Sequence, residues 1–144
     1  MRVRVSSDPS CAALRFLGGQ SLVEFALALP LLVLLVAITA DIGRAFTAYI
    51  ELGNMAREGA RYGAISPATA VDTAGIRDAA LGEGMTIFGT TPTIQSTAQT
   101  ERRGTQQYMY VTVTARLDFE PLIQLPPIPA SIPIEREVTM MVLR

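Results

Sequence analysis

One carboxylate, Glu24, has the clearest chemical consequence of any side chain in this sequence. It lies near the start of a run, Leu22 to Ala40, whose other residues are apolar, small or weakly polar. Inserting a carboxylate into a membrane as part of a helix costs roughly 2.5–3.5 kcal/mol. A chain that carries this cost normally uses the charge; the simplest alternative is that the carboxyl group only reaches the lipid headgroups.

The other reactive side chains argue against catalysis. The 144 residues include one cysteine, Cys11, and no histidine. Ser-His-Asp catalysis, Cys-His catalysis and most zinc sites therefore lack their residues, and no intrachain disulfide can form. The sequence also lacks a glycine-rich phosphate loop and a basic cluster typical of nucleic-acid binding. We therefore expect no enzyme activity, metal or cofactor, and neither a nucleic acid nor a small-molecule substrate as partner.

The run from Leu22 to Ala40 predicts a transmembrane helix. Its nineteen residues are close to the ~20 that cross the hydrocarbon core of a bilayer. The run is too long for the apolar part of an ordinary signal peptide, contains an acid and lacks a following small-x-small cleavage site. Pro30 predicts a kink, because proline removes a backbone hydrogen bond. Arginines flank the run on both sides, and the short N-terminal flank favours a cytoplasmic N-terminus with the bulk of the chain outside.

We expect one unbroken helix from about Ser21 to Gly63, with an amphipathic second half. Its apolar and small residues recur in steps of four and three, which is typical of a helix: Ile42, Phe46, Tyr49, Gly53, Ala56, Ala60 and Gly63. The small residues from Gly53 to Gly63 permit a close approach, so a sheet or another helix should pack tightly there. Ordinary core packing is the simpler interpretation, and contact between helices of different molecules is the alternative. Ser66-Pro67 should end the helix.

The rest of the chain predicts a small antiparallel sheet. Asp72-Thr73 can cap a short helix that ends near Gly82. Alternating apolar residues then indicate three strands, over residues 93–98, 108–119 and 134–143, with a turn at Glu101–Gly104. Such a sheet needs a cover for its apolar face, and the stripe from Gly53 to Gly63 can provide it. The expected fold class is α+β, a long N-terminal helix, transmembrane in its first half, that packs through its second half against three antiparallel strands.

A proline-rich and apolar loop, residues 121–129, joins the last two expected strands. Proline fixes an extended backbone, so the loop can hold its shape without hydrogen bonds. Its large apolar side chains are Leu122, Ile123, Leu125 and Ile128. They either close the bottom of a small core or form a patch that contacts a partner or the membrane.

Three segments resemble the TadE-like pseudopilins of the tight-adherence (Tad, or Flp) pilus, a type IV pilus system. They are Gly19-Gln20-Ser21-Leu22-Val23-Glu24-Phe25 with the apolar span behind it, Asp41-Ile42-Gly43-Arg44, and Ala56-Arg57-Glu58-Gly59-Ala60-Arg61. The resemblance implies a pilin-like organisation, with a prepilin-type leader over residues 1–19, a transmembrane segment over residues 20–40 and an extracytoplasmic α+β domain over residues 41–144. It also implies that a prepilin peptidase cuts the chain between Gly19 and Gln20.

The same resemblance implies a role for Glu24 in assembly. After the cut, Glu24 is the fifth residue, Phe25 follows it, and Gln20 carries a new α-amino group that is charged over much of the physiological pH range. In pilin-like assemblies, this amine and the fifth-position carboxylate of a neighbouring subunit can neutralise one another. A paired charge is tolerable in apolar surroundings, where an isolated one is not, so the pair would set the register of subunit packing.

The resemblance thus implies a minor pseudopilin that assembles rather than catalyses. It would lie in the cytoplasmic (inner) membrane as a single-pass protein, with its N-terminus in the cytoplasm, and associate with the pilus. Its implied partners are the membrane, the prepilin peptidase, other Tad pilins and pseudopilins, and the pilus assembly platform. The alternative is an uncleaved single-pass membrane protein whose outer domain binds a ligand or an envelope component.

Overall fold

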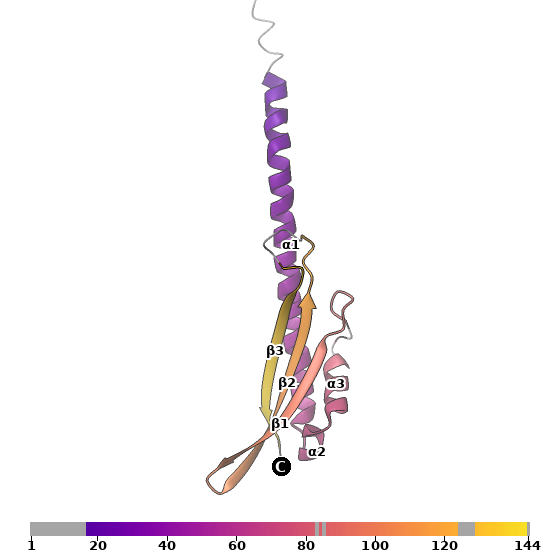
Figure 1. Cartoon of the computed structure of the whole chain (residues 1–144), viewed down its shortest axis with the longest axis vertical. Coiled ribbons are helices and arrows are strands. Elements are labelled where there is room, and N and C mark those ends of the chain that lie inside the picture. Colours follow the sequence, from indigo (N-terminus) through magenta and orange to yellow (C-terminus); the bar gives the residue numbers. More distant parts are fainter. Residues whose placement is uncertain (1–16, 83, 85, 124–128, 144) are drawn as a thin grey trace, which may run out of the picture. The chain divides into compact units, whose positions relative to one another are not determined.

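The computed structural model describes residues 17–143 except 83, 85 and 124–128. The chain divides into two units, Met1–Thr39 and Ala40–Arg144, and one helix, α1 (Leu17–Gly63), belongs to both. In the second unit follow the helices α2 (Pro67–Ala70) and α3 (Thr73–Gly82) and the strands β1 (Thr93–Arg103), β2 (Gln106–Phe119) and β3 (Ile132–Met141) (Figure 1). This confirms the α+β class and a long apolar helix followed by a small antiparallel sheet.

In the first unit, α1 is an apolar helix. Most of its large side chains from Leu22 to Ile38 are exposed, and Leu34 is half-buried. By length and composition, α1 is the one helix of the described residues that could cross a membrane. The helix continues through Pro30, whose missing N–H group leaves the carbonyl group of Ala26 without its helical donor.

The sheet has the strand order β1-β2-β3, with both neighbouring pairs antiparallel. Alternation along β2 follows the prediction, because Val111, Val113, Ala115 and Leu117 are buried and their neighbours are more exposed. The β1–β2 ladder, however, runs as far as the pair Arg103–Gln106. The prediction of a turn at Glu101–Gly104 was therefore wrong for Glu101 to Arg103. The chain turns at Gly104, whose φ of 64° is easy only for glycine.

Two short helices connect α1 to the sheet. The predicted one, α3, begins after Asp72, whose Oδ1 accepts a hydrogen bond from the backbone of Gly75 at 3.0 Å. The helix α2, which forms one turn after α1, is not among the predicted elements. Ser66 caps it, since its Oγ accepts from Thr69 N at 3.2 Å and its own N–H group donates to Thr69 Oγ1 at 2.9 Å. This reciprocal arrangement is a capping box.

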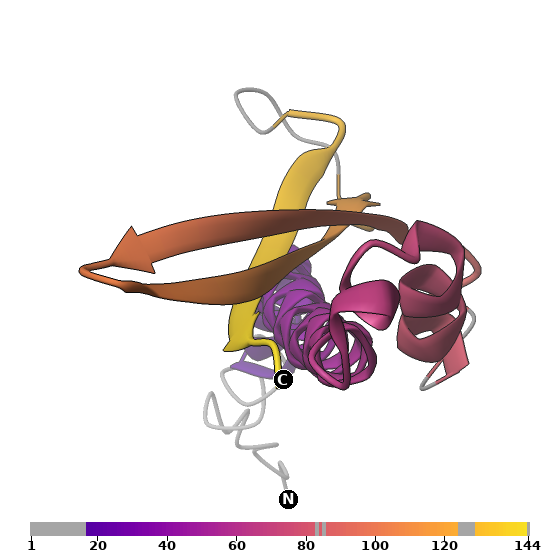
Figure 2. The ribbon, with the colours of Figure 1, turned by 90° about the horizontal axis from the view of Figure 1, so that it is seen from below.

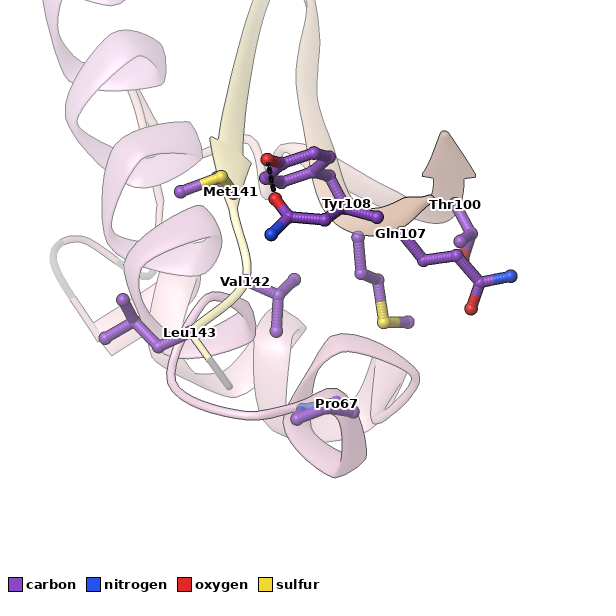
Figure 3. Close-up of a pocket in the computed structure, with 9 residues that line it drawn as sticks. Pro67, Thr100, Gln107, Tyr108, Met141, Val142 and Leu143 are labelled. Atoms are coloured by element: carbon purple, nitrogen blue, oxygen red, sulfur yellow. Dashed lines mark hydrogen bonds between the residues drawn. The ribbon is translucent and has the colours of Figure 1, made fainter. Parts of the chain in front are cut away.

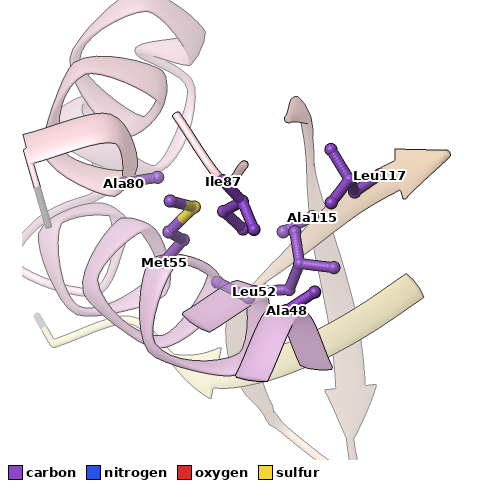
Figure 4. Packing of buried hydrophobic residues seen from close by; sticks show 8 residues of the cluster. Ala48, Leu52, Met55, Ala80, Ile87, Ala115 and Leu117 are labelled. Carbon is purple, nitrogen blue, oxygen red and sulfur yellow. The ribbon is translucent and has the colours of Figure 1, made fainter. Parts of the chain in front are cut away.

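The core of the second unit lies between α1, α3 and the sheet. Seen end-on in Figure 2, the sheet and the α2–α3 pair lie on different sides of the 40–63 part of α1. One buried cluster is formed by Ala48, Leu52, Met55 and Ala56 of α1 with Ala80, Ile87, Ala115 and Leu117 (Figure 4). Burying Leu52 and Met55 contributes about 1.5–3 kcal/mol each. A second cluster joins Ala60 to Ile76, Val111 and Val113.

The apolar stripe predicted along α1 divides into two parts. Ala56, Ala60 and Gly63 are buried, as the sequence analysis expected of the part that packs against the sheet. Ile42 and Phe46 are exposed instead, and the buried face at that level is formed by Ala48 and Leu52. The periodicity was correct, but the sheet covers a different side of the helix there.

Candidate functional site

The residues predicted for processing and assembly lie at the N-terminal end of α1. Gln20 and Glu24 are one helical turn apart, and Gln20 Nε2 donates a hydrogen bond to Glu24 Oε1 at 3.2 Å. Such i,i+4 pairs contribute only a few tenths of a kcal/mol on a helix surface. Phe25 is 58% exposed. The side chain of Glu24 is thus held locally, on a surface that the described chain leaves open.

The Gly19–Gln20 bond lies in α1, close to Leu17, the first residue of this helix that the structure describes. Glycine is about 1 kcal/mol worse than alanine in a helix. Cleavage at this bond stays a prediction.

The Asp41-Ile42-Gly43-Arg44 segment forms the centre of a hydrogen-bonded cluster. Both carboxylate oxygens of Asp41 accept from the backbone nitrogen of Leu122 at 3.0 Å, and Oδ2 also accepts from Ile123 N at 3.3 Å. Arg44 Nη1 donates to Asp41 Oδ1 at 3.0 Å. The pair is largely buried, with side-chain exposures of 13% for Asp41 and 28% for Arg44. This cluster ties the beginning of the proline-rich loop to α1.

Two aromatic rings hold the guanidinium group of Arg44. Its Cζ lies 4.9 Å from the ring centroid of Phe88 and 5.2 Å from that of Phe119, which is within the range of cation–π attraction. Phe88 has a φ of 50° and Gly89 a φ of 83°, between Ile87 and Thr90, which exchange two backbone hydrogen bonds. Two positive φ values in a two-residue turn are typical of type I′, although phenylalanine rarely adopts one.

Sequence reasoning missed this cluster. The signal available was the i,i+3 spacing of Asp41 and Arg44, which predicts a pair on one helix face. The partners on the loop, on β2 and on the Ile87–Thr90 turn are distant in sequence, so no local pattern indicates them.

The Ala56–Arg61 segment is a packing surface. Ala56 and Ala60 are buried. A Cβ atom on Gly59 would lie 3.2 Å from Ala80 Cβ, from the carbonyl oxygen of Ile76 and from Val113 Cγ1. These distances are shorter than ordinary van der Waals contact, so a larger residue at position 59 would require α3 or β2 to move by a few tenths of an ångström. On the outer side of the helix, Arg61 Nε donates to Glu58 Oε2 at 2.8 Å.

The loop residues proposed as a partner patch are only partly described. Leu122 is 66% exposed, and Ile123 is half-buried with its amide bound to Asp41. Leu125 and Ile128 lie outside the described residues. For Leu125 and Ile128, closure of the core and an interaction patch thus both stay predictions.

A guanidinium group lies on the inner side of β3. Arg136 Cζ is 4.4 Å from the ring centroid of Tyr49, and its Nη1 donates to the Tyr49 hydroxyl. Its Nε is buried without a hydrogen-bond partner among the described residues. Gly53 makes room for it, because a Cβ atom there would lie 3.4 Å from this nitrogen. The arrangement is structural and offers no acid–base pair.

An open cavity of about 380 Å³ lies between α2, the β1–β2 hairpin and the end of β3 (Figure 3). Its walls include Pro67, Tyr108, Met141, Val142 and Leu143. The Tyr108 hydroxyl donates to Gln106 Oε1. Around this cavity, the described side chains place no nucleophile beside a base and no cluster of metal ligands.

Residues 19–61 match the protein-family model described as TadE-like protein. This segment is TadE-like. The match confirms the resemblance that the sequence suggested, and it includes Gly19, Glu24, the Asp41–Arg44 cluster and the Ala56–Arg61 packing surface. No curated protein and no solved structure matches the chain. The TadE-like segment includes the apolar run of α1 and the part of α1 that packs in the core of the second unit.

Proposed function

We propose that this chain is a minor pseudopilin of a Tad (Flp) pilus apparatus and acts by assembling with other subunits. The observation that carries the proposal is the TadE-like match over residues 19–61, because this family implies a Tad pilus-associated protein. TadE-like pilus components are structural proteins.

The proposed first step is removal of residues 1–19 by a prepilin peptidase. The Gly19–Gln20 bond lies near the start of the described part of α1, and the family match begins at Gly19. The product would begin with Gln20, whose new α-amino group is a cation next to an apolar helix.

The proposed second step is pairing of that amine with Glu24 of a neighbouring subunit. Within one chain, Gln20 and Glu24 are already adjacent, so the amine and carboxylate of each subunit belong to one local polar patch. Most of the large apolar side chains from Leu22 to Ile38 are exposed. Lipid covers them before assembly, and the helices of other subunits would cover them afterwards.

The proposed location is the cytoplasmic membrane, with the N-terminus in the cytoplasm and the α+β unit outside. The apolar helix α1 suggests a membrane protein, and the orientation is the one that the resemblance to TadE-like pseudopilins implies. A reporter enzyme that is active only outside the cytoplasm, fused after Arg144, should be active.

Deletion of the gene in its native host tests the proposed function. Pili should be lost or reduced on deletion and restored by the wild-type chain. Normal piliation of the deletion strain, with the other pilus genes intact, would contradict the assignment.

A further inference from the structure

We propose that one end of the second unit rests in the interfacial region of a lipid bilayer. Large apolar side chains are exposed at this end on four separate segments. We call them the basal surface: Ile42 and Phe46 of α1, Phe88 of the Ile87–Thr90 turn, Leu122 of the loop and Ile132 at the start of β3. The occupant assigned to this surface is lipid. The inference requires that the apolar run enters a membrane, but it does not require cleavage at Gly19.

The Asp41–Arg44 pair holds these segments together. Leu122 donates its amide to Asp41, and the Phe88 ring lies over the Arg44 guanidinium group. Phe119, on which Arg44 also lies, pairs with Ile132 in the β2–β3 ladder. The basal surface is therefore one end of the unit rather than a set of scattered residues.

Chain connection places this end next to the bilayer. Ala40 is both the last residue of the apolar run and the first residue of the second unit. Along the helix, Ile42 is about 3 Å and Phe46 about 9 Å beyond Ala40. The interfacial region adds about 5–8 Å on each side of the hydrocarbon core. Ile42 thus falls inside this region, and the side chain of Phe46 reaches its outer edge.

The Asp41–Arg44 pair at this end suits a medium of low polarity. Asp41 and Arg44 neutralise each other, and the carboxylate is further satisfied by two backbone amides. A hydrogen-bonded ion pair tolerates desolvation better than a single charge does. Nearby, Asp118 lies 3.6 Å from Arg116, and Glu120 is exposed. The end as a whole has no excess of positive charge, so the contact should be apolar and independent of anionic lipid.

A second copy of this chain fits the surface less well than lipid does. Each copy would have its own apolar run in the same bilayer, so both basal surfaces would face that bilayer. They cannot then cover one another. Exposed phenylalanine and isoleucine side chains of this kind otherwise form an apolar patch in water, which soluble surfaces avoid.

Spin labels can locate the basal surface in the full-length chain. Cys11 is replaced by serine, and single cysteines are introduced by Phe46→Cys, Phe88→Cys and Leu122→Cys. Asn54→Cys and Glu101→Cys are controls, since both positions are exposed and lie outside the basal surface. Leu32→Cys reports the apolar run. The chains are reconstituted at a high lipid-to-protein ratio into phosphatidylcholine vesicles, with and without phosphatidylglycerol.

The readout is the accessibility of each label to oxygen, which is concentrated in lipid, relative to a polar nickel chelate. The inference expects this ratio to shift toward oxygen at positions 46, 88 and 122, relative to positions 54 and 101, in both vesicle types. Ratios equal to those of the two controls would overturn it. Low accessibility to both reagents would also overturn it, in favour of a protein neighbour. A label at position 32 that is exposed to water would show that the apolar run is not in the membrane, which would overturn the premise of the inference.

Discussion

Asp41 and Leu122 lie 81 residues apart in the chain, yet each carboxylate oxygen of Asp41 is 3.0 Å from the backbone nitrogen of Leu122. Asp41 is the first residue after the apolar run, and Leu122 is the second residue of the proline-rich loop. One side chain thus connects the point where the helix leaves the proposed membrane to the loop between β2 and β3. Arg44 also donates to Asp41. This hydrogen bond and the contact with Leu122 give a structural reason for the spacing of Asp41 and Arg44 in the TadE-like segment.

Replacing Asp41 by alanine should release the loop from α1. The amides of Leu122 and Ile123 lose their acceptor, so their hydrogen exchange should become faster, while amides within β2 keep their protection. Hydrogen exchange with mass spectrometry measures this. The matched control is Glu51→Ala, on the same helix, which should leave both amides unchanged. Unchanged exchange in Asp41→Ala would show that the contact does not hold the loop.

Glycine at position 63 should be necessary for the close contact between α1 and β2. A Cβ atom there would lie 2.9 Å from Val111 Cγ2 and 3.1 Å from Ile76 Cδ1. Overpacking of this kind destabilises by about 1–3 kcal/mol, so Gly63→Val should lower the melting temperature of the second unit. The near-UV signal of its tyrosines follows this melting.

The control for Gly63 is Gly43→Ala, in the same helix. A Cβ atom on Gly43 meets nothing within 4 Å, and alanine is the better helix former by about 1 kcal/mol. This variant should melt at the same temperature as the wild type or slightly higher. Equal melting of Gly63→Val and Gly43→Ala would contradict the packing described.

The cap of α3 should make the stability of the second unit depend on pH. The backbone N–H of Gly75, and then the hydroxyl group of Tyr62, hold the pKa of Asp72 below its ordinary value of 3.8. Because the folded-state pKa is lower, the carboxylate stabilises the fold above pH 3.8. This contribution is lost as the pH falls through the folded-state pKa.

Asp72→Asn should therefore melt lower than the wild type at pH 7, and the difference should shrink as the pH falls below about 3.8. Thermal unfolding at several pH values measures this. A constant difference for Asp72→Asn from pH 7 to pH 3 would indicate that its charge is not the cause.

Glu24→Leu should separate membrane insertion from assembly. Removing the carboxylate removes an insertion cost of roughly 2.5–3.5 kcal/mol, so the amount of chain in the membrane should be unchanged or higher. Pilus assembly should fall, since the proposed partner of the Gln20 amine is missing. Membrane fractionation and pilus counts measure the two effects, with Val23→Leu as the control. Normal piliation with Glu24→Leu would mean that the acid has no role in assembly.

The sequence predicted most of the fold because its strongest signals are local. The apolar run and the alternation from Val111 to Leu117 each specify one element by periodicity, and Asp72 predicted the start of α3. The end of β1 was missed because Glu101 to Arg103 are polar and precede a glycine, which is also typical of a turn. In the structure, pairing with Gln106 to Tyr108 extends the strand through them.

The cluster around Arg44 could not be predicted in the same way. Its partners Phe88, Phe119 and Leu122 come together only when the sheet packs on α1. Tertiary packing also decides which side of α1 the sheet covers. For this reason, the regular spacing of the stripe did not indicate that Ile42 and Phe46 are exposed.

The most direct test of the proposed function is the identity of the first residue of the chain in the membrane. The chain is purified from cells with an active prepilin peptidase and from cells with an inactive one, and its intact mass is measured. We expect a chain that begins at Gln20 in the first case and one that retains residues 1–19 in the second. A chain that still begins before Gly19, in cells that process another prepilin, would contradict the proposed function.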